Sequence, residues 1–165
     1  MQQYFQFISL ANALVVFAIL YLTIRPTLIN LGRRKHLMIL VSIHLFRYIG
    51  LTLYLPNLFD YEANGVPEHL AIQLAYWDFI NGLLALVAFV SLKYNFKFAN
   101  VLTWIFVIVA MGDQTISGSQ VMQYITDSTK IGAMPWLLVT VYLPVLFVSS
   151  IAIIQMLLSA ERVPN

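Results

Sequence analysis

The sequence contains no cysteine and few charged residues, and both absences exclude classes of protein. Without cysteine there is no disulfide framework, no thiol nucleophile and no thiolate metal site. Charged residues make up 10% of the 165 residues, whereas 61% are hydrophobic. So few polar side chains cannot cover a soluble globular surface, and a disordered chain or a nucleic-acid-binding module would need more charge. With a mean hydropathy of +0.82, the sequence indicates an integral membrane protein whose main partner is the lipid bilayer.

Five apolar segments are each long enough to cross a bilayer, which takes about 20 residues of helix. They cover residues 4–24, 37–55, 70–92, 98–117 and 135–158. Strands of a membrane β-barrel would have about ten residues of alternating polarity, whereas these segments are longer and do not alternate. The sequence therefore predicts an all-α polytopic membrane protein, in which residues 1–165 form a single bundle of five transmembrane helices.

The loop charges predict the orientation of the bundle, because basic residues gather in cytoplasmic loops. Seven basic residues fall on one side, in the loops after the first and third spans and in the C-terminal tail: Arg25, Arg33, Arg34, Lys35, Lys93, Lys97 and Arg162. The opposite loops contain only Lys130. We therefore predict a multi-pass protein of the cell membrane with its N-terminus outside and its C-terminus in the cytoplasm.

Ionisable side chains inside the spans are the best pointers to function, because an Arg or Asp there costs about 2.5–3.5 kcal/mol. His44 and Arg47 share one face of the second span, and Asp78 and Asn81 share one face of the third. At about 1.5 Å of rise per residue, Arg47 lies roughly 15 Å into a core of about 30 Å from one side. Asp78 lies roughly 12 Å in from the other. The sequence predicts that Arg47 contacts Asp78 directly or through one water.

Other polar groups are expected near the same level of the membrane. Asn12 of the first span lies within a turn of it, and Asp113 is placed one to two turns further out. In the fifth span, Pro144 removes a hydrogen bond and frees the carbonyl of Thr140, so that this carbonyl and the Thr140 hydroxyl can join the polar layer. Close approach of helices beside this layer is expected at Gly50, Gly82 and Gly112.

Two carboxylates beside one arginine leave a surplus negative charge that must be hydrated, protonated or matched by a cation. This favours a small proton- or ion-coupled transporter or permeation unit. Arg47 would hold an anionic group or poise Asp78, and Asp78 or Asp113 would exchange a proton or cation. One bundle of this size offers little room for a wide pore, so a homo-oligomer is expected to complete the pathway. The sequence does not name the solute or ion.

Two other functions stay open. A membrane-embedded enzyme, or a lipid- or quinone-binding protein, would use His44 and Asp78 for acid–base chemistry beside an apolar pocket. A structural or accessory subunit would use the Arg–Asp pair only to set helix packing. His44 can be a proton relay or a neutral hydrogen-bonded side chain. No cofactor or metal is expected, since His36 and His69 lie at the edges of the spans and no ligand motif is present.

The stretch His44–Leu51, with the sequence HLFRYIGL, resembles a segment of a group of small five-helix bacterial membrane proteins. Further segments are similar to that group: Asp78 followed by Leu83-Leu84-Ala85-Leu86, Trp104-Ile105-Phe106 followed by Gly112-Asp113, and Pro144 in the last helix. The chain differs where Asn, Gly and His are expected, at Val107, Trp77 and Ser149-Ser150. The resemblance covers about residues 40–150 and implies a five-helix fold, these candidate residues and a bacterial inner membrane, but no activity.

Overall fold

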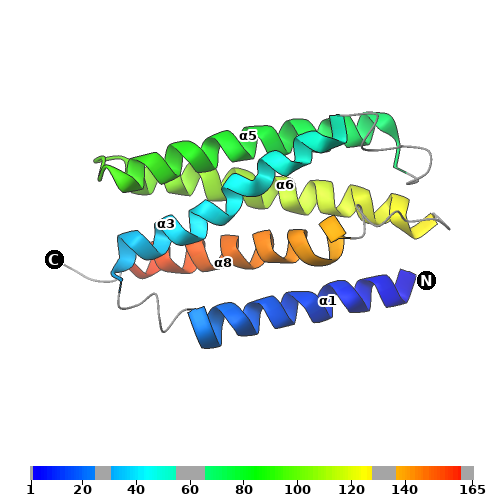
Figure 1. The fold of residues 1–165 in the computed structure, drawn as a ribbon, viewed down its shortest axis with the longest axis horizontal. Helices are drawn as coiled ribbons and strands as arrows, with labels where there is room; N and C mark the ends of the chain where they lie inside the picture. The colour runs from blue at the N-terminus through cyan, green and yellow to red at the C-terminus, as the bar shows by residue number, and fades with distance from the viewer. Residues whose placement is uncertain (1, 25–30, 55–65, 128–136, 161–165) are drawn as a thin grey trace.

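Helices make up all the regular structure in the part of the chain that the structure describes. The computed structural model describes residues 2–24, 31–54, 66–127 and 137–160. These residues form five helical rods that run antiparallel to their chain neighbours along the bundle (Figure 1). In chain order the elements are α1 (Gln2–Ala18), η1 (Ile19–Ile24), α3 (Arg33–Ile43), η2 (His44–Tyr54), α5 (Glu68–Lys93), α6 (Ala99–Asp127), η3 (Leu138–Tyr142) and α8 (Leu143–Ala160).

Three of the five rods change their helical type along their length. The first rod passes from α1 into the π-helix η1, and the second passes from α3 into the 3₁₀ helix η2. The last rod begins as the π-helix η3 and continues as α8. The third and fourth rods, α5 and α6, are α-helices of 26 and 29 residues. They form the regular frame against which the irregular second rod packs.

Four helices of the described chain are long and apolar enough to cross a membrane, namely Arg33–Tyr54, Glu68–Lys93, Ala99–Val121 and Thr140–Ser159. They correspond to the second to fifth predicted spans. The first predicted span is helical, but its α-helix has 17 residues and ends at Ala18, where η1 begins. The all-helical fold is therefore confirmed. A membrane crossing by the first predicted span, and the orientation of the bundle, stay predictions.

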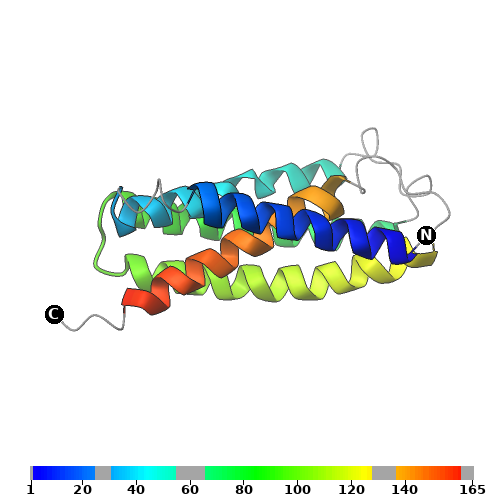
Figure 2. The same ribbon diagram turned by 90° about the horizontal axis from the view of Figure 1, so that it is seen from below.

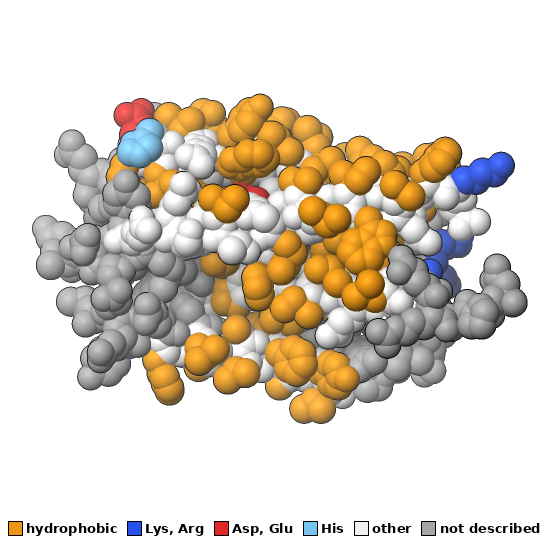
Figure 3. Space-filling view, turned by 180° about the vertical axis from the view of Figure 1, so that it is seen from behind, with side chains coloured by type: hydrophobic (Ala, Val, Ile, Leu, Met, Phe, Trp, Pro, Cys, Tyr) orange, Lys and Arg blue, Asp and Glu red, His pale blue; other side chains and the backbone are white. Residues whose placement is uncertain are grey.

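The second to fifth rods form the core of the bundle, and the first lies outside it. α5 packs against η2 and α6, and α8 packs against α3 and α6. α1 lies beside α8 and η3 in both ribbon views (Figure 2). Side chains of α1 such as Phe7, Leu10 and Leu14 are exposed, and hydrophobic side chains cover much of the face in Figure 3. An apolar outer surface of this kind suits lipid.

The two ends of the bundle carry opposite charges (Figure 3). One end, which we name the basic end, holds Arg33, Arg34 and Lys35 at the start of α3 and Lys93 and Lys97 where α5 gives way to α6. The other, named the acidic end, holds Glu68 at the start of α5.

The fourth rod is longer than predicted, because the expected end at Ser117 was wrong. α6 continues without a break to Asp127. Ser117 donates its hydroxyl hydrogen to Asp113 Oδ1 at 2.6 Å, and Ser119 donates to the carbonyl of Ile116 at 2.7 Å. Because these serines satisfy their hydroxyls within the helix, they do not end it. Asp113 consequently lies at the midpoint of α6 rather than near its outer end.

Candidate functional site

The 3₁₀ helix η2 aligns the residues that it buries in one row. Its buried residues are His44, Arg47, Gly50 and Leu53, each three positions after the last. A 3₁₀ helix has 3.0 residues per turn, so side chains at i and i+3 lie one above the other. In an α-helix each successive member would turn about 60° away from the one before. At 11 residues η2 is unusually long, since 3₁₀ runs beyond about 3–4 residues are uncommon and often mark a hinge or strain.

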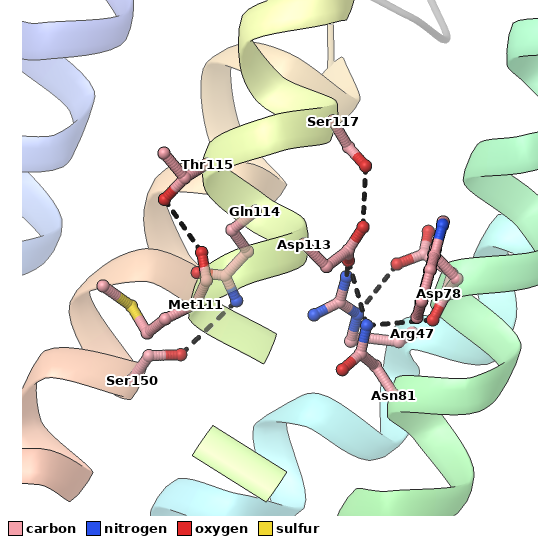
Figure 4. Close-up of polar contacts among 10 residues, drawn as sticks. Arg47, Asp78, Asn81, Met111, Asp113, Gln114, Thr115, Ser117 and Ser150 are labelled. Carbon is pink, nitrogen blue, oxygen red and sulfur yellow. Dashed lines mark hydrogen bonds and ion pairs between the residues drawn. The ribbon is translucent and has the colours of Figure 1, made fainter. Parts of the chain in front are cut away.

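Arg47 lies between two carboxylates from neighbouring helices (Figure 4). Its Nε donates to Asp78 Oδ1 of α5 at 2.8 Å, and its Nη2 donates to Asp113 Oδ2 of α6. The contact between Arg47 and Asp78 that the depth estimate predicts is present. Asp113 contacts Arg47 directly, so its placement one to two turns further out was wrong; that depth is counted from a span end at Ser117, whereas α6 continues to Asp127.

Asp113 is held by more partners than Asp78. Asn81 Nδ2 donates to Asp113 Oδ2 at 3.0 Å and also to the carbonyl of Trp77 at 2.9 Å. Together with Arg47 and Ser117, this gives Asp113 three donors, and only 5% of its side chain is exposed. Asp78 bonds to Arg47, and 21% of its side chain is exposed. We name Arg47, Asp78, Asn81, Asp113 and Ser117 the charged cluster.

His44 lies outside the charged cluster, one 3₁₀ turn nearer the basic end. Its ring is fully buried and meets the edge of Phe106, with the ring centroids 5.0 Å apart. Its Nε2 shares a hydrogen bond with the hydroxyl of Ser149 at 2.9 Å, and that hydroxyl also donates to the carbonyl of Leu146. The geometry is that of a hydrogen-bonded side chain in an apolar layer.

Asn12 and Thr140 form a third polar contact, on the side of α1. Pro144 has no N–H to give to the carbonyl of Thr140 four residues earlier. Around this point the rod is π-helical, with the N–H of Leu143 donating to the carbonyl of Leu138. Asn12 Nδ2 donates to the Thr140 carbonyl at 2.6 Å. This hydrogen bond attaches α1 to the last rod.

A change of Asn12 to leucine should destabilise the folded protein by about 1 kcal/mol, because the buried Thr140 carbonyl loses its side-chain donor. In a Pro144→Ala background the same change should cost much less, since the main-chain N–H is restored. Thermal unfolding of the four variants in detergent would measure this coupling. An equal loss in both backgrounds would show that Asn12 acts through something other than the proline's missing donor.

A cavity of about 100 Å³ opens from the charged cluster toward the acidic end. A single water needs about 10–15 Å³ of such space, so there is room for several. Its polar lining consists of Arg47, Asp78, Asp113, Gln114, Ser117 and Tyr142. Three buried atoms on this lining make no hydrogen bond with the described chain, namely Arg47 Nη1, Gln114 Oε1 and the Tyr142 hydroxyl. The arrangement can therefore bind a proton, a small cation or a polar group.

The bundle is closed on the other side of the cluster. Between the cluster and the basic end, a large apolar core fills the space between α3, α5, α6 and α8. Leu37 and Leu40 of α3, Phe106 of α6 and Ile153 of α8 are among its fully buried members. Toward the acidic end the apolar packing is smaller, around Leu53 and residues of α5. The cavity of the charged cluster thus lies on the side of the acidic end.

Sequence reasoning missed several residues that complete the site. The sequence predicts Ser117 only as the end of a span, although this residue lies four positions after Asp113 and so on the same helical face. Gln114 and Tyr142 line the cavity, and Ser149 meets His44. Of these, only Ser117 had a usable signal in its spacing. Within the part of the chain that the structure describes, no three His, Asp or Glu side chains form a group able to hold a metal ion.

Glycine allows close packing at two of the three predicted positions. A Cβ on Gly50 would lie 2.7 Å from the Cβ of Asp78, and one on Gly82 would lie 3.2 Å from the ring of Tyr48. The prediction for Gly112 was wrong, since a Cβ there meets no atom within 4 Å. The close approach of η2 to α5 at Gly50 is what lets Arg47 reach Asp78.

Comparison with known proteins identifies a family but no activity. No curated protein and no solved structure matches the chain. The resemblance to small five-helix bacterial membrane proteins stays a prediction. The model of a domain of unknown function, DUF8737, matches residues 5–158, which include the charged cluster and nearly all of the five rods. The chain therefore belongs to the DUF8737 family.

Proposed function

We propose that the protein is a small proton- or cation-coupled transporter or permeation unit of the cell membrane. The observation that carries the proposal is the charged cluster at the inner end of a cavity, midway along helices of membrane-spanning length. The basic end would face the cytoplasm and the N-terminus the outside, following the distribution of basic residues.

The charges of the cluster favour exchange of a cation. One guanidinium is bonded to two carboxylates, so the fully ionised cluster carries one surplus negative charge. An uncompensated charge is costly away from water. A proton or a small cation entering from the cavity would remove that cost. A bundle that needed only a neutral pair for packing would need only one of the two acids.

The two carboxylates suit different roles. Asp113, with three donors, would keep Arg47 anchored to α6 throughout the cycle. Asp78, with one donor and greater exposure, would take up and release the proton or cation. When Asp78 is neutralised its ion pair with Arg47 weakens, while the pair with Asp113 persists. The charge on Asp78 would in this way be coupled to the position of the Arg47 side chain, and through it to η2.

Access from the two sides would alternate through the second rod. In the proposed orientation the cavity leads outward and the apolar core closes the cytoplasmic side. The long 3₁₀ segment η2 is suited to act as the hinge. Conversion of part of it to α-helix would turn the row from His44 to Leu53 relative to α5. A second copy of the chain is proposed to complete the pathway, since one bundle offers little space.

Proteoliposomes that enclose a pH-sensitive dye would test the proposal, with Na⁺ and K⁺ gradients applied in turn. The wild-type protein should move protons or cations faster than empty vesicles, and Asp78→Asn should abolish this flux. Glu68→Gln is the matched control, because it removes an exposed acid at the acidic end and should leave the flux unchanged. No flux above the empty vesicles, or equal flux in Asp78→Asn, would contradict the proposal.

The apolar walls of the cavity favour a second candidate, a binding site for a lipid- or quinone-like amphiphile. Eight of its lining residues have apolar side chains, from four rods and the segment before α5: Leu53, Val66, Ala71, Leu74, Val121, Leu138, Leu143 and Leu146. Arg47 and Tyr142 would then bind the polar head. Mass spectrometry of the purified protein would identify such a molecule. Its presence, together with no proton or cation flux in the proteoliposomes, would favour this candidate.

A further inference from the structure

A second cavity, of about 440 Å³, lies at the basic end between the start of α3 and the connection from α5 to α6. Three cationic side chains and two amide side chains line it, with apolar residues beside them: Arg33, Arg34, Lys97, Asn95, Asn100, Leu37, Leu92, Phe96 and Ala99. No acidic residue is among them. All described acids lie elsewhere, at mid-bundle or at the acidic end.

One wall of this cavity is a fixed turn. Asn95 adopts a left-handed backbone conformation with φ of 54°. Its N–H donates to the carbonyl of Leu92, and the N–H of Phe96 donates to the carbonyl of Ser91 at 3.0 Å. This pair of hydrogen bonds is the Schellman motif that ends helices, with Asn95 in the left-handed position. Asn95 and Lys97 are therefore held in place beside the cavity before any ligand binds.

Two helices begin at this cavity, which adds to its positive potential. α3 begins at Arg33 after Gly32, which provides no side-chain cap, and α6 begins at Ala99. Neither helix has an acidic residue in its first turn. The N-terminal end of a helix carries partial positive charge and favours anions such as phosphate. The cationic side chains and the N-terminal ends of the two helices thus both make the potential at this cavity more positive.

The apolar surroundings favour a lipid as the source of the anion. Leu37 and Leu92 are buried at the floor of the cavity, whereas Phe96, Phe98 and Val101 are exposed beside it. A phosphate held by the cations would place acyl chains over these exposed side chains. We propose that this cavity binds the phosphate group of an anionic phospholipid from the leaflet at the basic end. Leu92 of the lining is fourteen residues along α5 from Asp78, or roughly 21 Å, so the site is separate from the charged cluster.

Native mass spectrometry of the full chain in detergent would test the proposal, with phosphatidylglycerol, phosphatidylcholine or inorganic phosphate added. The test variant is Arg34→Gln/Lys97→Gln, because Arg33 also bonds to the carbonyl of Met156. Lys35→Gln/Lys93→Gln is the matched control, which removes the same charge at the same end outside the lining. The wild type and the control should retain phosphatidylglycerol, and the test variant should bind it more weakly by roughly 30-fold.

The outcomes separate the sources of binding. Preference for phosphatidylglycerol over phosphatidylcholine that is lost only in the test variant supports the proposal. Binding of inorganic phosphate, with no preference between the two lipids, would overturn the lipid and assign a free phosphate instead. An equal loss of phosphatidylglycerol binding in both double variants would mean that the basic surface attracts anionic lipid in general. That result would overturn the proposed site. Proton or cation flux is not used as a readout, so failure here leaves the proposed function standing.

Discussion

Arg47→Leu should destabilise the folded protein by about 3–5 kcal/mol, the cost typical of removing one partner of a buried ion pair. The change leaves Asp78 and Asp113 facing each other without the guanidinium that bonds to both. Leucine fills part of the same space, so lost packing contributes less than uncompensated charge. The midpoint of thermal unfolding in detergent, together with the yield of monodisperse protein, would measure the effect.

Recovery from Arg47→Leu depends on both acids. Arg47→Leu/Asp78→Asn should recover only part of the stability, because Asp113 is left buried without its guanidinium partner. Adding Asp113→Asn should recover much of the rest. The control triple variant adds Glu68→Gln in place of Asp113→Asn and should gain nothing further. Full recovery in the double variant would mean that Asp113 is not coupled to Arg47, contrary to the geometry.

The same variants separate a functional cluster from one that only sets helix packing. If the triple variant regains stability but carries no proton or cation flux, the charges serve transport as well as folding. If it regains stability and flux remains as in the wild type, the charged cluster has a structural role alone, and the accessory-subunit hypothesis is the better one. The wild-type flux measurement is needed first, since it provides the reference for both outcomes.

The sequence predicted the helical fold and the central ion pair because both depend on simple physical quantities. Runs of about 20 apolar residues favour helices in lipid whatever their exact order. Arg47 and Asp78 each lie near the middle of such a run, and the cost of an unpaired charge brings them together. The depth estimate used the rise per residue and the ends of the two spans, and errors of a few residues in those ends still leave Arg47 and Asp78 near the middle of the bundle.

The same estimate failed for Asp113 because it depended on where the fourth span ends. Ser117-Gly118-Ser119 is typical of a loop, and ending the span there placed Asp113 close to a surface. In the structure these serines bond within the helix, so α6 extends to Asp127 and Asp113 lies at its centre. Local composition favours a loop here, and only the four-residue spacing between Asp113 and Ser117 indicates that the helix continues.

The 3₁₀ form of η2 is not among the predictions, although the spacing of three between His44, Arg47 and Gly50 is a signal for it. No proline interrupts His44–Tyr54, and an α-helix is the default for an apolar segment. The polar and small positions repeat every three residues, which matches three residues per turn better than 3.6. Tertiary contact decides the outcome, since the row must place both Arg47 and Gly50 against α5.

Gly50→Ala should break the contact between η2 and α5 and with it the ion pair to Asp78. The added Cβ would lie 2.7 Å from the Cβ of Asp78 and 2.8 Å from its Cγ, closer than real Cβ contacts. The Cβ of Asp78 is fixed to the backbone and cannot rotate away, so the helices must separate, and the carboxyl group of Asp78 must turn away from Arg47. Overpacking of this kind costs about 1–3 kcal/mol, and the lost ion pair adds to it.

Gly112→Ala is the matched control for that change. It adds the same methyl group at mid-bundle, next to Asp113 in sequence, but its Cβ meets no atom within 4 Å. Alanine is also favoured over glycine inside a helix by about 0.8–1.0 kcal/mol, so Gly112→Ala should be neutral or stabilising. Thermal unfolding and ion flux should therefore fall together in Gly50→Ala and stay at wild-type values or above in Gly112→Ala. If Gly50→Ala unfolds at the wild-type temperature with its flux intact, the close approach of η2 to α5 does not hold Arg47 against Asp78.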